Sequence, residues 1–137
     1  MATINATISI ASNAMTYPVN INKSMVMKKL ESSTGLENTD GLSSKKFAAT
    51  SYVKIIEADD STSSKASKVY VRNTGSSKTT YFYIAINASA AAADTAETIG
   101  RLYGGDWMLI PYEGATDIGV QPSTVEPMTL EFCMFYE

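Results

Sequence analysis

The sequence predicts an all-β protein, an antiparallel two-sheet β-sandwich of jelly-roll-like type with about eight strands. Short apolar runs with period-two alternation recur along the chain, and turn-forming residues separate them. Helix-competent sequence is confined to Ala88–Glu97, which is expected to form a loop or a single helical turn. At 137 residues the chain is expected to fold as one domain spanning residues 1–137.

The N-terminal segment has the clearest alternation. Apolar and polar residues alternate strictly over residues 3–10, with Ile4, Ala6, Ile8 and Ile10 on one side. This pattern is typical of a half-buried strand. A turn at Ala11–Ala14 leads to a second strand region over Met15–Met27, with Val19 and Ile21 facing inward.

The middle of the chain contains a long polar segment and an expected hairpin. Residues Glu31–Lys46 are polar and aperiodic, and we predict a long loop that serves as a contact arm. A strand is expected over Phe47–Ala58. The segment Val69–Asn87 has two apolar runs around TGSSK and predicts a β-hairpin.

The last third of the chain predicts three strands. The first, Ile99–Pro111, is expected to be continuous except for a bulge at Gly104 and Gly105. A short strand over Asp117–Gln121 follows, and Met128–Tyr136 closes the chain with strict alternation. Because this end is apolar, we expect the chain's own sheet or a partner to bury it.

Composition excludes several kinds of chemistry. With no histidine and a single cysteine, Cys133, the chain has no catalytic triad, no usual zinc ligand set and no internal disulfide. A net charge of −3 argues against nucleic-acid binding. We find neither a signal peptide nor a membrane-spanning apolar run, so synthesis in a cytoplasm is expected, followed by retention there or release within a larger particle. We therefore expect no enzyme activity and no cofactor.

Three further motifs give only weak signals of chemistry. The carboxylates could form a glycosidase pair, but a solvated loop rim is the expected role. They are Glu57, Asp59, Asp60, Asp106, Glu113 and Asp117. Asp59 and Asp60 lack the spacing of a calcium loop. Residues Gly100–Gly105 lack the Lys-Ser/Thr of a phosphate loop.

Aromatic residues gather in the second half of the chain. The set comprises Tyr81, Tyr83, Tyr103, Trp107 and Tyr112. Such rings can stack on sugars, but packing in a core or a subunit interface is the commoner use and the one we expect here.

Two segments carry a resemblance to a known class of proteins. VYVRNTGSSKTTYFYIAI, followed by IGRLYGGDWMLIPYEGATDIGV and an aromatic C-terminal strand, resembles small β-rich virion structural proteins of tailed bacteriophages. The match covers roughly Val69 to Tyr136. It implies a structural protein of the particle, made in the host cytoplasm, and leaves its position open among head decoration, head fibre, neck and tail.

Among these positions we expect a capsid decoration (cement) protein on the outer capsid surface, whose partners are the major capsid protein and itself, as a homotrimer. Candidate core or subunit contacts are Tyr81, Tyr83, Trp107, Tyr112, Phe132, Met134 and Tyr136. Candidate shell contacts are Leu36, Leu42, Lys45 and Lys46, with the N-terminal residues as a second possibility. The alternatives are a neck, tail or head-fibre component, for which the Val69–Asn87 hairpin could join a ring, and a carbohydrate-binding adhesin module.

Overall fold

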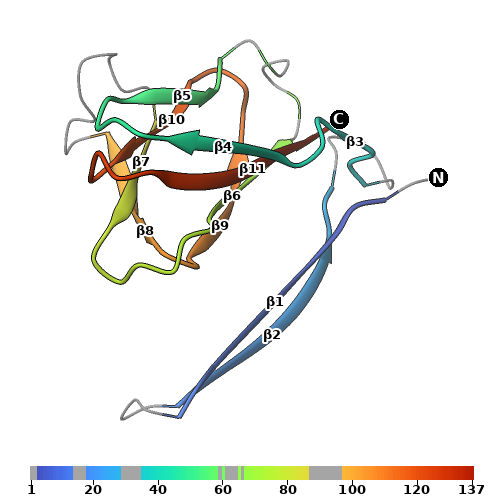
Figure 1. Ribbon diagram of the computed structural model, residues 1–137. Helices are drawn as coiled ribbons and strands as arrows, with labels where there is room; N and C mark the ends of the chain where they lie inside the picture. The colour runs from blue at the N-terminus through green and yellow to red at the C-terminus, as the bar shows by residue number, and fades with distance from the viewer. Residues whose placement is uncertain are drawn as a thin grey trace.

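The computed structural model describes residues 3–13, 18–28, 35–58, 60, 65, 67–86 and 97–137. Within these ranges every helix or strand assigned is a β-strand, and all strand pairs are antiparallel (Figure 1). The prediction of an all-β antiparallel protein is therefore confirmed. The strands form one two-stranded, one four-stranded and one five-stranded sheet.

The two-stranded sheet pairs β1 (Asn5–Ser12) with β2 (Val19–Val26). The four-stranded sheet contains, in order, β5 (Val53–Ile56), β10 (Ile118–Pro122), β7 (Tyr81–Ile86) and β8 (Thr98–Tyr103). In the five-stranded sheet, β11 (Met128–Tyr136) pairs on one side with β6 (Ser67–Asn73), which in turn pairs with β9 (Trp107–Tyr112). On its other side β11 pairs with β3 (Asn38–Thr39) and β4 (Ser43–Phe47).

The two larger sheets share one hydrophobic core and form a sandwich-like body. Val69 and Val71 of β6 and Phe82 and Ile84 of β7 are at most 1% exposed. Phe82 also meets Phe47 of β4 edge-to-face, with ring centroids 5.4 Å apart. Each fully buried side chain of this size stabilises the fold by roughly 1.5–3 kcal/mol. The body is therefore held by side chains that alternate inward from both sheets.

Strands from the first half of the body pair with strands from the second half in reverse order. β4 pairs with β11, β5 with β10, β6 with β9, and β7 with β8. As a result, β4 to β7 alternate between the two sheets along the chain.

The predicted hairpin over Val69–Asn87 is wrong. β6 and β7 do not pair with each other, because they belong to opposite sheets. The predicted single strand over Ile99–Pro111 is also wrong, since its halves are β8 and β9 of different sheets. In each case the turn residues allow the chain to cross from one sheet to the other.

These two crossings pack against each other. The buried Asn73 accepts a hydrogen bond from the Gly75 N–H through Oδ1 (3.0 Å), and its Nδ2 donates to the Leu102 carbonyl of the other sheet (2.9 Å). The Gly104 N–H donates to the Ser77 carbonyl (2.9 Å). A Cβ at Gly104 would lie 2.5 Å from the Ser77 backbone nitrogen, so only glycine fits. Gly105 has φ +91°, which glycine adopts without strain.

The predicted loop over Glu31–Lys46 is wrong in its second half. Residues 38–39 and 43–46 are strand, because the edge of β11 supplies partners for their backbone groups. Residues 31–34 of the predicted loop lie outside the described residues, as does nearly all of Ala88–Glu97.

Candidate interaction surface

The β1–β2 ribbon leaves the body as a separate arm (Figure 1). Its ladder is unbroken from the pair Asn5–Val26 to the pair Ser12–Val19, and neither strand pairs with the other two sheets. Every residue of β2 is exposed. We refer to residues Asn5–Ser12 and Val19–Val26 as the arm.

The arm has one apolar and one polar face, because residues opposite each other in an antiparallel pair share a face. The apolar face consists of Ala6, Ile8, Ile10, Val19, Ile21 and Met25, together with Ser12 and Lys23. The polar face consists of Asn5, Thr7, Ser9, Asn20, Asn22 and Ser24, together with Ala11 and Val26. The alternation thus exists as predicted, but a half-buried strand is wrong, since Ile10 is 45% and Met25 48% exposed.

A short backbone network fixes the arm to the body. The Met27 N–H donates to the Ile4 carbonyl (2.9 Å), and the Leu36 N–H donates to the Met27 carbonyl (2.6 Å). The side chains of Met27 and Leu36 are buried there. A Cβ at Gly35 would lie 2.7 Å from Val26 Cγ1, so the close approach depends on glycine. This junction, which we call the root of the arm, is therefore held by hydrogen bonds and buried side chains, although the arm itself is exposed.

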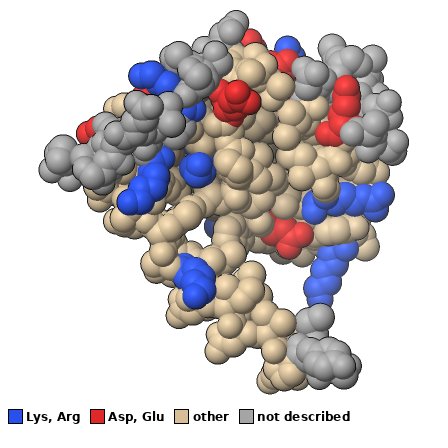
Figure 2. Space-filling view, turned by 180° about the vertical axis from the view of Figure 1, so that it is seen from behind, with Lys and Arg blue, Asp and Glu red and all other residues tan. Residues whose placement is uncertain are grey.

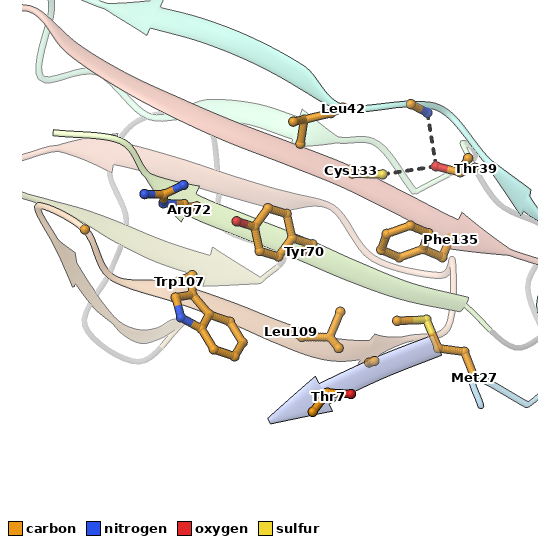
Figure 3. A pocket seen from close by; sticks show the side chains of 13 residues that line it. Thr7, Met27, Thr39, Leu42, Tyr70, Arg72, Trp107, Leu109, Cys133 and Phe135 are labelled. Carbon is orange, nitrogen blue, oxygen red and sulfur yellow. Dashed lines mark hydrogen bonds between the residues drawn. The ribbon is translucent and has the colours of Figure 1, made fainter. Parts of the chain in front are cut away.

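Two open apolar hollows lie between the arm and the five-stranded sheet. One, of about 850 Å³, lies over the outer face of the sheet beside the arm's base (Figure 3). The other, of about 530 Å³, lies between the apolar face of the arm and β9. Ala6, Thr7, Trp107 and Leu109 line both hollows. We call the combined space the wedge.

The sheet side of the wedge is aromatic and aliphatic. Tyr70 of β6 lies between Leu109 of β9 and Cys133 of β11 in the ladder. Along the same face, Arg72 lies beside Trp107 and 3.9 Å from Glu131. Phe135 and Leu42 extend the apolar surface toward β3 (Figure 3). Trp107 is 49% exposed, so a large part of this surface faces solvent.

The structure divides the predicted core or subunit contacts into two groups. Met134 and Tyr112 are buried in the core, and Phe132 and Tyr136 pack against it. Trp107 instead lies on the outer face of the sheet. The strand of residues 128–136 alternates as predicted, with Met128, Leu130 and Met134 inward.

Tyr81 and Tyr83 belong to a cluster on the four-stranded sheet. Their hydroxyls are 3.0 Å apart and their rings meet edge-to-face. The Arg101 guanidinium lies 4.8 Å from the Tyr81 ring centre and 5.2 Å from that of Tyr83. A hydrogen bond with Tyr103 raises the pKa of Arg101. The cluster is a partly exposed cation–π group.

Three of the four predicted shell contacts lie on the surface. Leu36 is completely buried at the arm's root, so its assignment as a shell contact is wrong. Leu42 is exposed, and Lys45 and Lys46 are exposed on β4, which pairs only with β11. Lysines at such an edge discourage uncontrolled strand pairing.

The described carboxylates act mainly as local hydrogen-bond acceptors. Asp106 accepts from the Tyr103 N–H (2.9 Å), and Asp60 accepts from the Glu57 N–H (2.8 Å). Asp117 pairs with Lys54 (2.6 Å), and this hydrogen bond lowers its pKa, as does the Ala58 N–H. Among the described residues no three His, Cys, Asp or Glu side chains gather as a metal site. Asp59 lies outside these residues.

No known protein family, curated protein or solved structure matches this chain. In the part of the chain that the structure describes, no helix is long and apolar enough to cross a membrane. The arm and the wedge are therefore interpreted from their own chemistry.

Sequence reasoning missed the wedge as a site. Tyr70, Leu109 and Phe135 were not among the predicted contacts, because β6, β9 and β11 become neighbours only through the strand order. The arm could have been found from the sequence, since alternation on both sides of a turn is a hairpin signal.

Proposed function

We propose that the protein is a virion structural subunit, a decoration protein that binds and stabilises the outer head shell of a tailed bacteriophage. The observation that carries the proposal is the arm, a projecting ribbon with an exposed apolar face. An isolated two-stranded hairpin is at best marginally stable in water, so a face of this kind is expected to be covered in an assembly.

The jelly-roll assignment of the body belongs to this proposal. It is supported by the nested pairing of β4 with β11, β5 with β10, β6 with β9 and β7 with β8. A long antiparallel ribbon that folds over on itself gives this strand order. Jelly rolls recur in viral capsid and lectin domains.

A decoration protein of this kind would bind the capsid through many weak contacts. A subunit on a capsid lattice is present in many copies, and avidity replaces high affinity of each contact. In the proposal the major capsid protein contacts Lys45 and Lys46 on the exposed edge strand, while the arm joins copies of the chain to each other. Lys45 and Lys46 would contribute charge complementarity to an acidic shell surface.

A neck or tail ring component is the second candidate, and the arm also favours it. Ring subunits can join through projecting hairpins, and the arm offers such a hairpin where residues 69–87 do not. The number of copies in a particle separates the two candidates, since hundreds indicate decoration whereas six or twelve indicate a ring.

The direct test is rebinding to capsids from which the protein has been stripped. We expect saturable binding and greater heat resistance of the capsids. Lys45→Glu with Lys46→Glu should weaken binding about tenfold or more, whereas Lys78→Glu, in the exposed 74–80 crossing, should leave it unchanged. Failure of the wild-type protein to bind any region of the capsid would contradict the decoration role.

A further inference from the structure

The wedge has two walls, so an occupant would contact it through two faces. One wall is the arm, which lines the hollow beside β9 mainly with Ile8, Ile10 and Met25 of its apolar face, and also with Thr7 and Ser24. The other wall is the outer face of the five-stranded sheet, with Tyr70, Trp107 and Leu109. Both walls are partly exposed, so they do not close on each other.

A second copy of the chain supplies a segment of suitable shape, its own arm. In a reciprocal exchange each arm enters the wedge of the other copy. Because each apolar arm face points into its own wedge, the two apolar faces then meet. Lys23 on this face has a stem long enough to carry its charge past the ribbon edge.

The opposite, polar face of the incoming arm then rests on the sheet. It offers uncharged hydroxyls and amides, among them Thr7, Ser9 and Asn22. The sheet offers the Tyr70 hydroxyl, the Trp107 indole N–H and the Arg72 guanidinium. Tyrosine and tryptophan suit such a surface, since they combine apolar area with a hydrogen-bonding group.

Area favours exchange over docking through one face. With about 3.4 Å per residue and about 4.8 Å between strands, the eight-residue ribbon has a face of about 270 Å². That is far below the about 800 Å² per partner of a standard specific interface. In an exchange each copy contributes two arm faces and one sheet face. If the covered sheet area equals the arm face laid on it, the total is about 800 Å² per copy.

Charge favours the same occupant. Residues 1–28 contain two lysines, Lys23 and Lys28, and no acidic residue. The rest of the chain therefore holds nine of the eleven cationic residues and all fourteen acidic ones. The body of one copy thus carries a net negative charge, which attracts Lys23 of a neighbour's arm at long range.

We infer that the wedge of each copy is the seat of the arm of a neighbouring copy. This inference rests on the self-association that the proposed function includes, and it names the site where that association occurs. Capsid binding is a separate property, so the two can fail independently.

Cross-linking between differently tagged chains tests the inference. Both chains carry Cys133→Ser; one then carries Ser9→Cys on the arm and the other Leu109→Cys on the sheet. After co-expression, a short bismaleimide should join the two tags. Val125→Cys, exposed on a loop outside the wedge, replaces Leu109→Cys in the matched control and should give no product.

Trp107, the sole tryptophan, gives a second readout. Its emission should shift to the blue as the wild-type protein assembles, and Ile10→Asp should abolish the shift. Ile99→Asp, at a similarly exposed position on β8 outside the wedge, should retain it. The inference is overturned if the Ser9→Cys and Leu109→Cys chains give no cross-linked product, whether the protein is an oligomer or a monomer. It is also overturned if the protein assembles without a shift of the Trp107 emission. Neither result bears on the proposed function, which the capsid-rebinding experiment tests separately.

Discussion

At the scale of single residues, two sequence motifs turn out to be one structural junction. The Asn73–Gly75 turn and the Gly104–Gly105 turn lie far apart in the sequence, yet their backbones are in contact. Asn73 holds the crossing in place through hydrogen bonds to both its own turn and the other sheet. The glycines, which suggested a strand bulge, are required by this contact instead.

Gly104→Ala should destabilise the body, because its Cβ would overlap backbone atoms of Ser76 and Ser77 that cannot move independently. A loss of about 2–4 kcal/mol is expected from overpacking and the displaced crossing. Gly100→Ala is the control, since no described atom beyond Gly100 and its two chain neighbours lies within 4 Å of the Cβ position. Urea unfolding of both variants measures the effect; equal stabilities would contradict the packed junction.

Tyr52→Phe should stabilise the protein. The Tyr52 hydroxyl is buried over Gly119 and has no hydrogen-bond partner among the described residues, and burial raises its pKa. Removing such a group is expected to gain about 1 kcal/mol. Tyr112→Phe should have the opposite effect, because the Tyr112 hydroxyl donates to the Thr116 carbonyl (2.8 Å). Thermal unfolding of the two variants should give shifts of opposite sign.

The Lys54–Asp117 pair predicts a pH dependence. The hydrogen bond from Lys54 lowers the pKa of Asp117 below its ordinary 3.8. The pair therefore stabilises the folded state above about pH 4, and this contribution is lost as the pH falls through the lower folded value. In Lys54→Met the pKa of Asp117 should rise, as NMR titration would reveal. An unchanged Asp117 titration would contradict the assigned cause.

At the scale of elements, alternation predicted strand faces well and sheet membership poorly. The inward set of β11 followed directly from period-two spacing, as did the two faces of β1. Alternation does not specify which strands pair, because pairing depends on contacts between distant segments. The crossings after β6 and β8 were consequently interpreted as a hairpin and a bulge.

The wedge depends on the same distant pairing. Trp107 could be selected from the sequence as a contact candidate, but Tyr70 and Leu109 join it only when β6 lies between β9 and β11. Leu36 shows the converse case, since its apolar side chain is buried by the folded root of the arm.

The arm should be dispensable for the stability of the body. It forms a separate sheet with exposed side chains, so Ile8→Asp with Ile21→Asp removes few contacts within one copy. The melting temperature of the monomeric variant should lie within a few degrees of that of wild-type monomer at high dilution. A large drop would mean that the arm belongs to the core of the fold.

At the scale of the whole molecule, the body and the arm have different requirements. The body has its own core between two sheets, whereas the arm exposes apolar side chains that water solvates poorly. We therefore propose that the chain is stable as a folded unit and is completed by assembly. This is the central claim, and it underlies both the virion role and the arm exchange.

Native mass spectrometry of wild-type protein and the Ile8→Asp, Ile21→Asp variant tests this claim most directly. The wild-type protein should form a discrete oligomer, and the variant should remain a folded monomer at the same concentration. A wild-type protein that stays monomeric at its highest soluble concentration, or a variant that assembles as readily, would contradict the account.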